Sequence, residues 1–195
     1  MLNDVNEYKP KYDLVDASDP VLREETEIFS FIDPPEEPVE FARELTEHML
    51  YYGGMGLAAP QLGKPYRVFA IQSNPVLVCY NPVIVDTSQL DQIELDEGCL
   101  SFPNLCFKVK RPKSIRIRYQ LPNGEIVTKT YTGMTARIMQ HEYDHLEGIL
   151  FIDRISKLKL DIAMKKSLKH KIEYKRNELD WDAIKNEIEK EIGST

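Results

Sequence analysis

Two histidines four residues apart are the side chains best suited to chemistry in this sequence. The segment 140–147 reads QHEYDHLE, and it contains His141 and His145. Positions i and i+4 share one face of an α-helix, so both imidazoles can bind the same metal ion. Glu142 is placed to take a proton from an attacking water and to deliver it to a leaving amine. The pattern predicts a metal-dependent hydrolase, with a chance match on a solvated helix as the alternative.

A cysteine in the segment 97–101, which reads EGCLS, is a candidate third ligand. Catalytic metal sites commonly use three protein ligands and leave a fourth position open. The thiolate of Cys99 together with two imidazoles suits Zn²⁺, Fe²⁺, Co²⁺ or Ni²⁺. The ordinary interpretation of such a cysteine is a small buried residue. Cys79 and Cys106 have no comparable setting, and we expect both to serve in packing.

Composition narrows the class of protein further. The chain has 195 residues, of which 42% are hydrophobic and 29% charged, as in an ordinary globular protein. Its net charge of −7 argues against DNA as a partner, because phosphate contacts need a clustered basic face. We find neither a membrane-spanning apolar run nor a secretion signal. Together with the small number of cysteines, three, these features predict that the protein works in a reducing cytoplasm. This would be the cytoplasm of a host if a virus encodes the chain. A location in an organelle is the alternative.

The elements that position these residues can be read from periodicity. Residues 135–147 are expected to form the helix that carries the histidines, ended by Gly148. An earlier helix should cover about 36–52 and stop at Gly53. Strands are expected at 66–72, 76–80, 83–85, 115–120 and 126–131, the last two joined by a turn at 122–124. We therefore predict an α+β domain in which short antiparallel strands pack around a central metal-binding helix.

The last forty residues have a different character. Apolar residues recur at helical spacing and predict a helical C-terminal extension over about 156–195, with one helix around Leu158 to Ile172 and a second from Asp180 to Gly193. Residues 156–177 carry eight basic and two acidic side chains. A solvated helix face is the default interpretation of such a run. The functional alternative is contact with ribosomal RNA.

A third segment, 54–63, reads GMGLAAPQLG. Its glycines permit tight turns and let a ligand approach the backbone closely. The segment lacks the third glycine of a dinucleotide fingerprint and the Gly-Lys-Ser/Thr ending of a phosphate-binding loop. From the residues alone, it is a loop after a helix, and Gln61 is an ordinary polar residue.

Together and in this order, the three segments resemble the motifs of peptide deformylases: Gly-x-Gly-φ-Ala-Ala-x-Gln, Glu-Gly-Cys-φ-Ser and Gln-His-Glu-x-x-Asp-His-φ-x-Gly, where φ is apolar. The resemblance extends from about Asp19 to Arg154. It implies hydrolysis of the N-formyl group from the initiator methionine of nascent peptides, with release of formate. It also implies that Cys99, His141 and His145 bind one divalent ion, usually Fe²⁺ in the cell, with Zn²⁺, Ni²⁺ and Co²⁺ as alternatives.

The resemblance assigns further roles. The tetrahedral oxyanion needs hydrogen-bond donors, which are expected to be the side-chain amide of Gln61 and the backbone N–H of Leu100. The backbone of Gly56 is expected to bind the substrate chain in an extended conformation. The methionine side chain needs an apolar slot, for which the expected walls are Leu57, Met134 and Ile138.

Acidic neighbours of the ligands suggest an outer layer of the site. Glu97 and Asp144 adjoin the motifs, and Arg111 follows the second motif. We expect Arg111 to pair with one or both carboxylates and so hold the ligands in position. Cys106 stands where many bacterial relatives have a larger polar or basic residue. The sequence leaves open whether this residue alters the rim of the substrate pocket.

Two other classes are weighed against a deformylase. A zinc peptidase of the His-Glu-x-x-His type needs neither a cysteine ligand nor the glycine-rich segment. A metal-binding or nascent-chain-binding module without catalysis needs neither Glu142 nor Gln61. The presence of all these features in one chain favours the deformylase.

Overall fold

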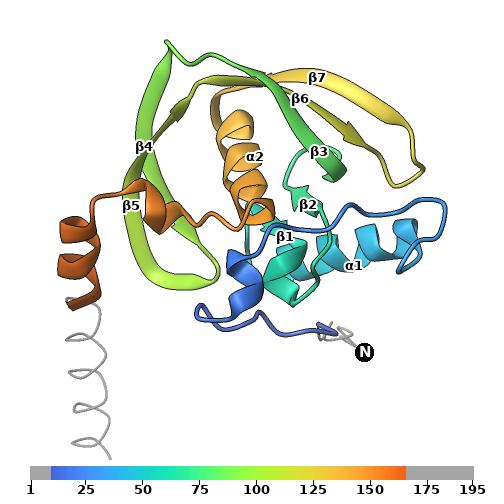
Figure 1. Cartoon of the computed structure of the whole chain (residues 1–195), viewed down its shortest axis with the longest axis horizontal. Coiled ribbons are helices and arrows are strands. Elements are labelled where there is room, and N and C mark those ends of the chain that lie inside the picture. Colours follow the sequence, from blue (N-terminus) through green and yellow to red (C-terminus); the bar gives the residue numbers. More distant parts are fainter. Residues whose placement is uncertain (1–9, 166–195) are drawn as a thin grey trace, which may run out of the picture. The chain divides into compact units, whose positions relative to one another are not determined.

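The chain forms two compact units, Met1–Arg154 and Ile155–Thr195. The structure, a computed structural model, describes residues 10–165 (Figure 1). In the second unit, residues 157–165 are helical, and the Ser156 hydroxyl accepts a hydrogen bond from the Lys159 N–H at 3.4 Å. The expected helix from Asp180 to Gly193, the part of the extension around Ile172, and the basic side chains from Lys166 onward lie outside the described residues.

The first unit is built from two antiparallel sheets and two α-helices, with short 3₁₀ turns. One sheet has the strand order β1-β2-β3-β6-β7, formed by Gly56–Ala58, Val68–Ile71, Leu77–Thr87, Ser114–Gln120 and Ile126–Thr132. The other is a hairpin of β4 (Gln92–Cys99) and β5 (Phe102–Pro112). The helices are α1 (Pro38–Tyr51) and α2 (Gly133–Leu146), and the 3₁₀ turns are η1 (Pro20–Arg23), η2 (Ala59–Leu62) and η3 (Phe151–Arg154). The predicted α+β class is confirmed.

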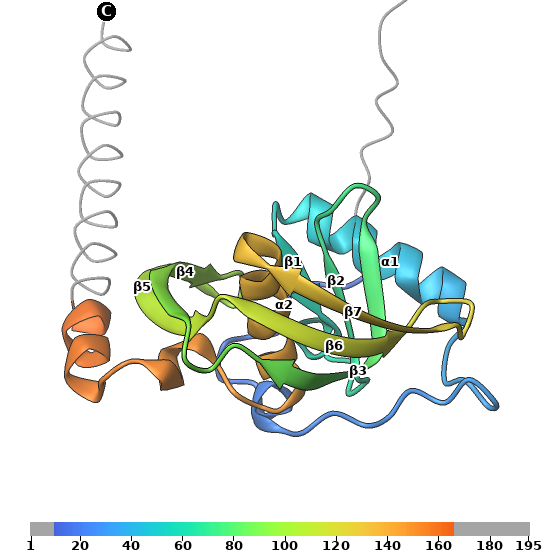
Figure 2. The same cartoon turned by 90° about the horizontal axis from the view of Figure 1, so that it is seen from above.

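Strands β1 and β2 are buried on both faces because a helix covers each side (Figure 2). In β2, Val68 and Ala70 belong to the cluster that contains the apolar face of α1. Phe69 and Ile71 belong to a second cluster, which contains Met139 of α2. Successive side chains of a strand point to opposite faces, so a strand between two helices must be apolar throughout. This burial explains why β2 reads as a continuous apolar run.

Helix α1 follows the prediction closely. Its buried side chains Phe41, Leu45 and Met49 recur every four residues and face the sheet. The helix ends where Gly53 adopts a φ of +68°, a conformation that glycine reaches without steric cost. The N–H groups of Gly53 and Gly54 bond back to the carbonyls of Leu50 and Met49. The glycine pair therefore both stops α1 and redirects the chain into β1.

Strand β3 differs from the prediction, which had two separate strands at 76–80 and 83–85. The structure has one strand with a register shift between Tyr80 and Val83. Asn81 lies in the shift with a φ of +47°. Its side chain accepts a hydrogen bond from the Phe29 N–H at 2.8 Å and donates one to the Phe29 carbonyl at 2.9 Å. The irregularity is thus held by a long-range partner that local sequence patterns do not reveal.

Strand β6 follows the predicted alternation, and β7 is its predicted partner strand. Ile115, Ile117 and Tyr119 are buried, whereas Arg116 and Arg118 point to solvent. Helix α2 begins two residues before the predicted start and ends one residue before the predicted end. No helix in the described range 10–165 is long and apolar enough to cross a membrane.

The hairpin β4–β5 was not predicted. Strand β4 is largely exposed, and its only buried residue is Glu97. Strand β4 thus lacks the buried apolar face by which a strand is recognised. In β5, Leu105, Phe107 and Val109 alternate with polar or small residues, so this strand did carry a period-2 signal that the prediction overlooked. The omission matters because Cys99 is the last residue of β4.

Candidate metal centre

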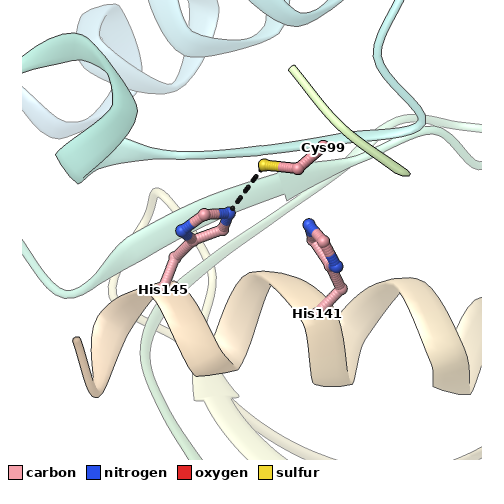
Figure 3. Close-up of side chains that lie close together, drawn as sticks. All are labelled: Cys99, His141 and His145. Atoms are coloured by element: carbon pink, nitrogen blue, oxygen red, sulfur yellow. Dashed lines mark hydrogen bonds between the residues drawn. The ribbon is translucent and has the colours of Figure 1, made fainter. Parts of the chain in front are cut away.

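Helix α2 and strand β4 bring three ligand-type side chains together. His141 and His145 lie one turn apart on α2, and Cys99 approaches them from the end of β4. One donor atom from each residue lies within 4.8 Å of the others, and Cys99 Sγ is 3.4 Å from His145 Nε2. Figure 3 shows the sulfur and the ring nitrogens directed toward one another. The cluster has the donors and the spacing to hold one metal ion.

The surroundings of the two imidazoles suit this use. Glu97 Oε2 lies 3.2 Å from His141 Nδ1, which leaves Nε2 of that ring for the cluster. Burial, together with the neighbouring His141 and Arg111, lowers the pKa of His145 well below its usual value. Its ring is therefore neutral, which is the form that binds metals. The donor set fits Zn²⁺, Fe²⁺, Co²⁺ and Ni²⁺ alike.

Glu142 occupies a buried position beside the cluster. Its side chain is 3% exposed, and its Oε2 atom has no hydrogen-bond partner within residues 10–165. Burial raises the pKa of Glu142 to about 7. A carboxyl group that titrates near neutrality suits proton transfer. The unpartnered oxygen marks a place where a ligand or a water would be bound.

Strand β1 passes directly against this carboxyl group. A Cβ atom added to Gly56 would lie 2.3 Å from Glu142 Oε1. Real Cβ atoms do not approach an oxygen so closely, so only glycine fits here without moving Glu142. The second glycine of the GMGLAAPQLG segment therefore makes room for the carboxylate.

Gln61 is oriented by the backbone next to it. Its Oε1 accepts a hydrogen bond from the Ala58 N–H at 2.9 Å. The amide nitrogen is consequently turned the other way, to 3.1 Å from Ser101 Oγ and 3.6 Å from Cys99 Sγ. Leu100 follows Cys99 in the tight connection between β4 and β5. The amide of Gln61 on η2 is thus directed toward the cluster.

A cavity of about 360 Å³ opens at this point. Its lining includes five residues that were predicted to bind the substrate or to stabilise the oxyanion: Gly56, Gln61, Leu100, Met134 and Ile138. It also includes Phe102, Leu105 and Arg137, which were not predicted as site residues. Phe102 and Leu105 belong to the hairpin β4–β5, which was not predicted.

One expected wall of the pocket and one open question about its rim are addressed by the structure. Leu57 does not line the cavity; it is fully buried in the cluster that contains α1. Neighbouring side chains of β1 point to opposite faces, so Leu57 points away from the α2 side that Gly56 faces. Cys106 is exposed and pairs with Gly98 in the hairpin, and it does not line the cavity either.

The expected pairing of Arg111 is confirmed. Its side chain, 2% exposed, donates to both oxygens of Glu97 at 2.7 and 2.9 Å and to Asp144 Oδ2 at 2.8 Å. Burial opposes the charge on Glu97, but hydrogen bonds with His141 and Arg111 outweigh it and lower the pKa of Glu97 to about 2. Arg111 therefore fixes an ionised carboxylate against His141.

A cysteine and two histidines beside a buried carboxyl group, in an apolar cavity of an α+β fold, define a metal-dependent hydrolase. Comparison with known proteins narrows this class. The profile of the polypeptide deformylase family matches residues 11–161. A peptide deformylase of Thermotoga petrophila is 42% identical over 151 residues, which cover 76% of this chain and 89% of the relative.

Solved structures agree with the sequence comparison. A peptide deformylase from Synechococcus elongatus is 37% identical, with a TM-score of 0.76 over 82% of this chain and 89% of that one. The enzyme from Thermotoga maritima is 38% identical, with a TM-score of 0.70 over 74% and 97% of the two chains. The chain belongs to the polypeptide deformylase family. It is a metal-dependent hydrolase that removes the N-formyl group from newly synthesised polypeptides.

Proposed function

We propose that Cys99, His141 and His145 hold the metal ion of this enzyme and that Glu142 moves the proton during deformylation. One observation carries the proposal: the three donor atoms lie within 4.8 Å of one another, and Glu142 lines the same cavity. When bound, a divalent ion supplies Lewis-acid chemistry, which polarises the formyl carbonyl and lowers the pKa of a water molecule.

Glu142 performs both proton transfers in this proposal. With a pKa raised to about 7 by burial, its carboxylate can accept a proton from the attacking water at neutral pH. The bond between the formyl carbon and the methionine nitrogen then breaks. Glu142 delivers this proton to the nitrogen, and the remaining hydroxyl proton of the former water also passes to the amine, so that formate and a protonated amine leave. The carboxylate is regenerated, so the cycle balances.

The developing oxyanion needs donors that are already oriented. The amide nitrogen of Gln61 is held toward Cys99 because its carbonyl oxygen is occupied by the Ala58 N–H. The backbone N–H of Leu100, next to Cys99, is the second proposed donor. Both belong to residues that line the cavity.

The substrate chain is proposed to lie along β1. This strand is at the edge of the five-stranded sheet, so one side of its backbone is open to an added strand. Gly56 presents backbone without a side chain there. The methionine side chain would then enter the apolar part of the cavity, between Met134 and Ile138 of α2 and Phe102 and Leu105 of the hairpin.

We propose Fe²⁺ as the ion used in the cell, with Zn²⁺, Ni²⁺ and Co²⁺ accepted by the same donors. A thiolate ligand needs protection from oxidation, and the free thiols of Cys79, Cys99 and Cys106 fit a reducing cytoplasm. Metal analysis of protein purified without oxygen tests the choice of ion. Zn²⁺ as the sole metal of active protein would contradict it.

Contact of residues 156–177 with the ribosome is a further proposal, supported by the eight basic side chains of that segment. Replacing Lys157, Lys159 and Lys165 by glutamate should reduce co-sedimentation with ribosomes at low salt. Unchanged co-sedimentation of a folded, active variant would contradict it.

Release of formate from formyl-Met-Ala-Ser by protein prepared without oxygen tests the catalytic assignment. We expect Glu142→Gln to keep its metal and lose turnover by about 10²- to 10⁴-fold, the usual contribution of a proton-transfer group. Glu125→Gln, at an exposed turn, is the matched control and should remain fully active. Full turnover in Glu142→Gln would remove the proposed role.

A further inference from the structure

Arg137 is a buried cation that the catalytic proposal does not use. It lies on α2 one turn before His141 and is 3% exposed. Its guanidinium donates to the Glu97 carboxylate, to the Val109 carbonyl at 3.0 Å and to the Ile93 carbonyl at 2.6 Å. All three acceptors belong to the hairpin β4–β5.

These contacts join the two elements that carry the ligand residues. Helix α2 carries His141 and His145, and β4 carries Cys99 two residues after Glu97. A planar guanidinium can donate in several fixed directions at once. Arg137 uses this geometry to contact both strands of the hairpin from the helix. The distance between the cysteine and the histidines therefore depends on this side chain.

Glu97 links the same contacts to a ligand ring. Arg137 and Arg111 both donate to its Oε1 atom, while Oε2 lies 3.2 Å from His141 Nδ1. Two hydrogen bonds to one oxygen fix the rotation of the Glu97 carboxylate. They thereby also fix the position of the other oxygen, which faces the His141 ring. Arg111, itself on β5, bonds back to Asp144 of α2, whereas Arg137 reaches from α2 to acceptors on both strands of the hairpin.

One feature of Arg137 is unfavourable for stability. Its Nε is buried and has no hydrogen-bond partner within the described residues. A buried donor without a partner carries a desolvation cost. A side chain that is retained at such a cost is typical of a functional position.

We propose that Arg137 is a positioning residue of the metal centre, which sets the affinity for the ion and the arrangement of its ligands. It does so by holding the Cys99 hairpin and the Glu97–His141 pair against α2. The inference rests on the proposed ligand set. If Arg137 served stability alone, its removal would lower the melting temperature and leave metal binding unchanged.

Co²⁺ binding to the full-length protein tests this inference, because the thiolate-to-Co²⁺ and d–d absorption bands report the ligands. We expect Arg137→Met to bind Co²⁺ about 10- to 100-fold more weakly, as is usual when an outer partner of a ligand is lost. Its d–d bands should also shift. Arg137→Lys should be intermediate, because an ammonium cannot span the three acceptors.

Arg67→Met is the matched control. Arg67 is 6% exposed and also ties α2 to the sheet, through Tyr143, Glu147 and the Pro82 carbonyl, but it contacts no ligand residue. This variant should lose stability and keep the Co²⁺ affinity and spectrum of the wild type. Affinity is measured by chelator competition below the melting temperature of every variant.

Any of three results overturns the inference. The first is wild-type Co²⁺ affinity and wild-type absorption bands in Arg137→Met. The second, if the methionine variant does not fold, is wild-type Co²⁺ affinity in Arg137→Lys. The third is a loss of Co²⁺ affinity in Arg67→Met equal to that in Arg137→Met. A different result tests the ligand set itself. If Cys99→Ser kept the thiolate-to-Co²⁺ band, the proposed metal site would be wrong, whatever Arg137 does.

Discussion

At the scale of single residues, the site depends on a close approach between backbone and side chain. Gly56 leaves no side chain between β1 and the carboxyl group of Glu142. Gly54, two residues earlier, is similarly crowded, since a Cβ there would lie 2.7 Å from Leu100 Cδ1. Gly54 and Gly56 thus make room for a cavity wall and for the proposed catalytic group. Their role is steric as well as conformational.

This contact predicts the effect of Gly56→Ala. The added methyl group would displace Glu142, and an error of about 1 Å in a catalytic group can cost about 10²-fold in rate. We expect kcat/KM for formyl-Met-Ala-Ser to fall by that order, while the metal content stays near that of the wild type.

A double variant distinguishes displacement of Glu142 from other ways in which Gly56→Ala could lower activity. In the Glu142→Gln background, Gly56→Ala should cost little further activity, because the displaced group no longer acts. Additive losses in the double variant would show that the alanine acts in another way, for instance by blocking the substrate chain.

At the scale of elements, an ionised carboxylate joins the hairpin to α2. Glu97 on β4 is surrounded by Arg111, Arg137 and His141. Burial raises the pKa of this side chain, but His141 and Arg111 outweigh it and hold the pKa at about 2, against an ordinary value of 4.5. A lowered folded-state pKa means that the charged form stabilises the fold above pH 4.5. That stabilisation is lost as the pH falls from 4.5 toward 2.

Acid should therefore weaken the fold through Glu97. The pKa difference corresponds to about 3 kcal/mol of unfolding free energy at neutral pH. We expect wild type and Glu97→Gln to differ by about this amount at pH 7 in urea unfolding, and the gap to shrink toward pH 2.

A chelator in both samples removes the contribution of bound metal. Glu94→Gln, which changes an exposed carboxylate of the same strand, should follow the wild type at every pH. A gap between wild type and Glu97→Gln that stayed constant from pH 7 to pH 2 would refute the linkage.

At the scale of the molecule, the proposed ligands come from parts of the chain far apart in sequence. Cys99 is the last residue of β4, and the two histidines lie on the central helix 42 and 46 residues later. An unfolded chain does not hold these groups together, so the ion binds the native state preferentially. Metal binding must then stabilise the whole fold.

Removal of the ion should lower the melting temperature. At an ion concentration about 100-fold above Kd, binding adds about 2.7 kcal/mol, or roughly 5–10 °C for a domain of this size. Chelation should remove this increment in calorimetry, and added Co²⁺ should restore it. Cys99→Ser should respond to neither treatment; a wild-type response in that variant would exclude Cys99 as a ligand.

Local patterns were sufficient for several parts of this protein. Helix α2 and the shared face of His141 and His145 follow from the 3.6-residue period, and β6 follows from its alternation. Helix α1 and its glycine stop depend on neighbouring residues alone. These features are determined within one or two turns of chain, so the sequence specifies them directly.

The remaining features depend on contacts between distant segments. Strand β4 has no buried apolar face, and the orientation of Leu57 depends on which helix covers each face of β1. No local sequence pattern predicts that the side chain of Arg137 reaches from α2 to the hairpin. The sequence by itself determined the helix and singled out the candidate donor residues. Only the tertiary structure decided how Cys99, Glu142 and the buried charges meet, because burial and long-range pairing are properties of the folded chain.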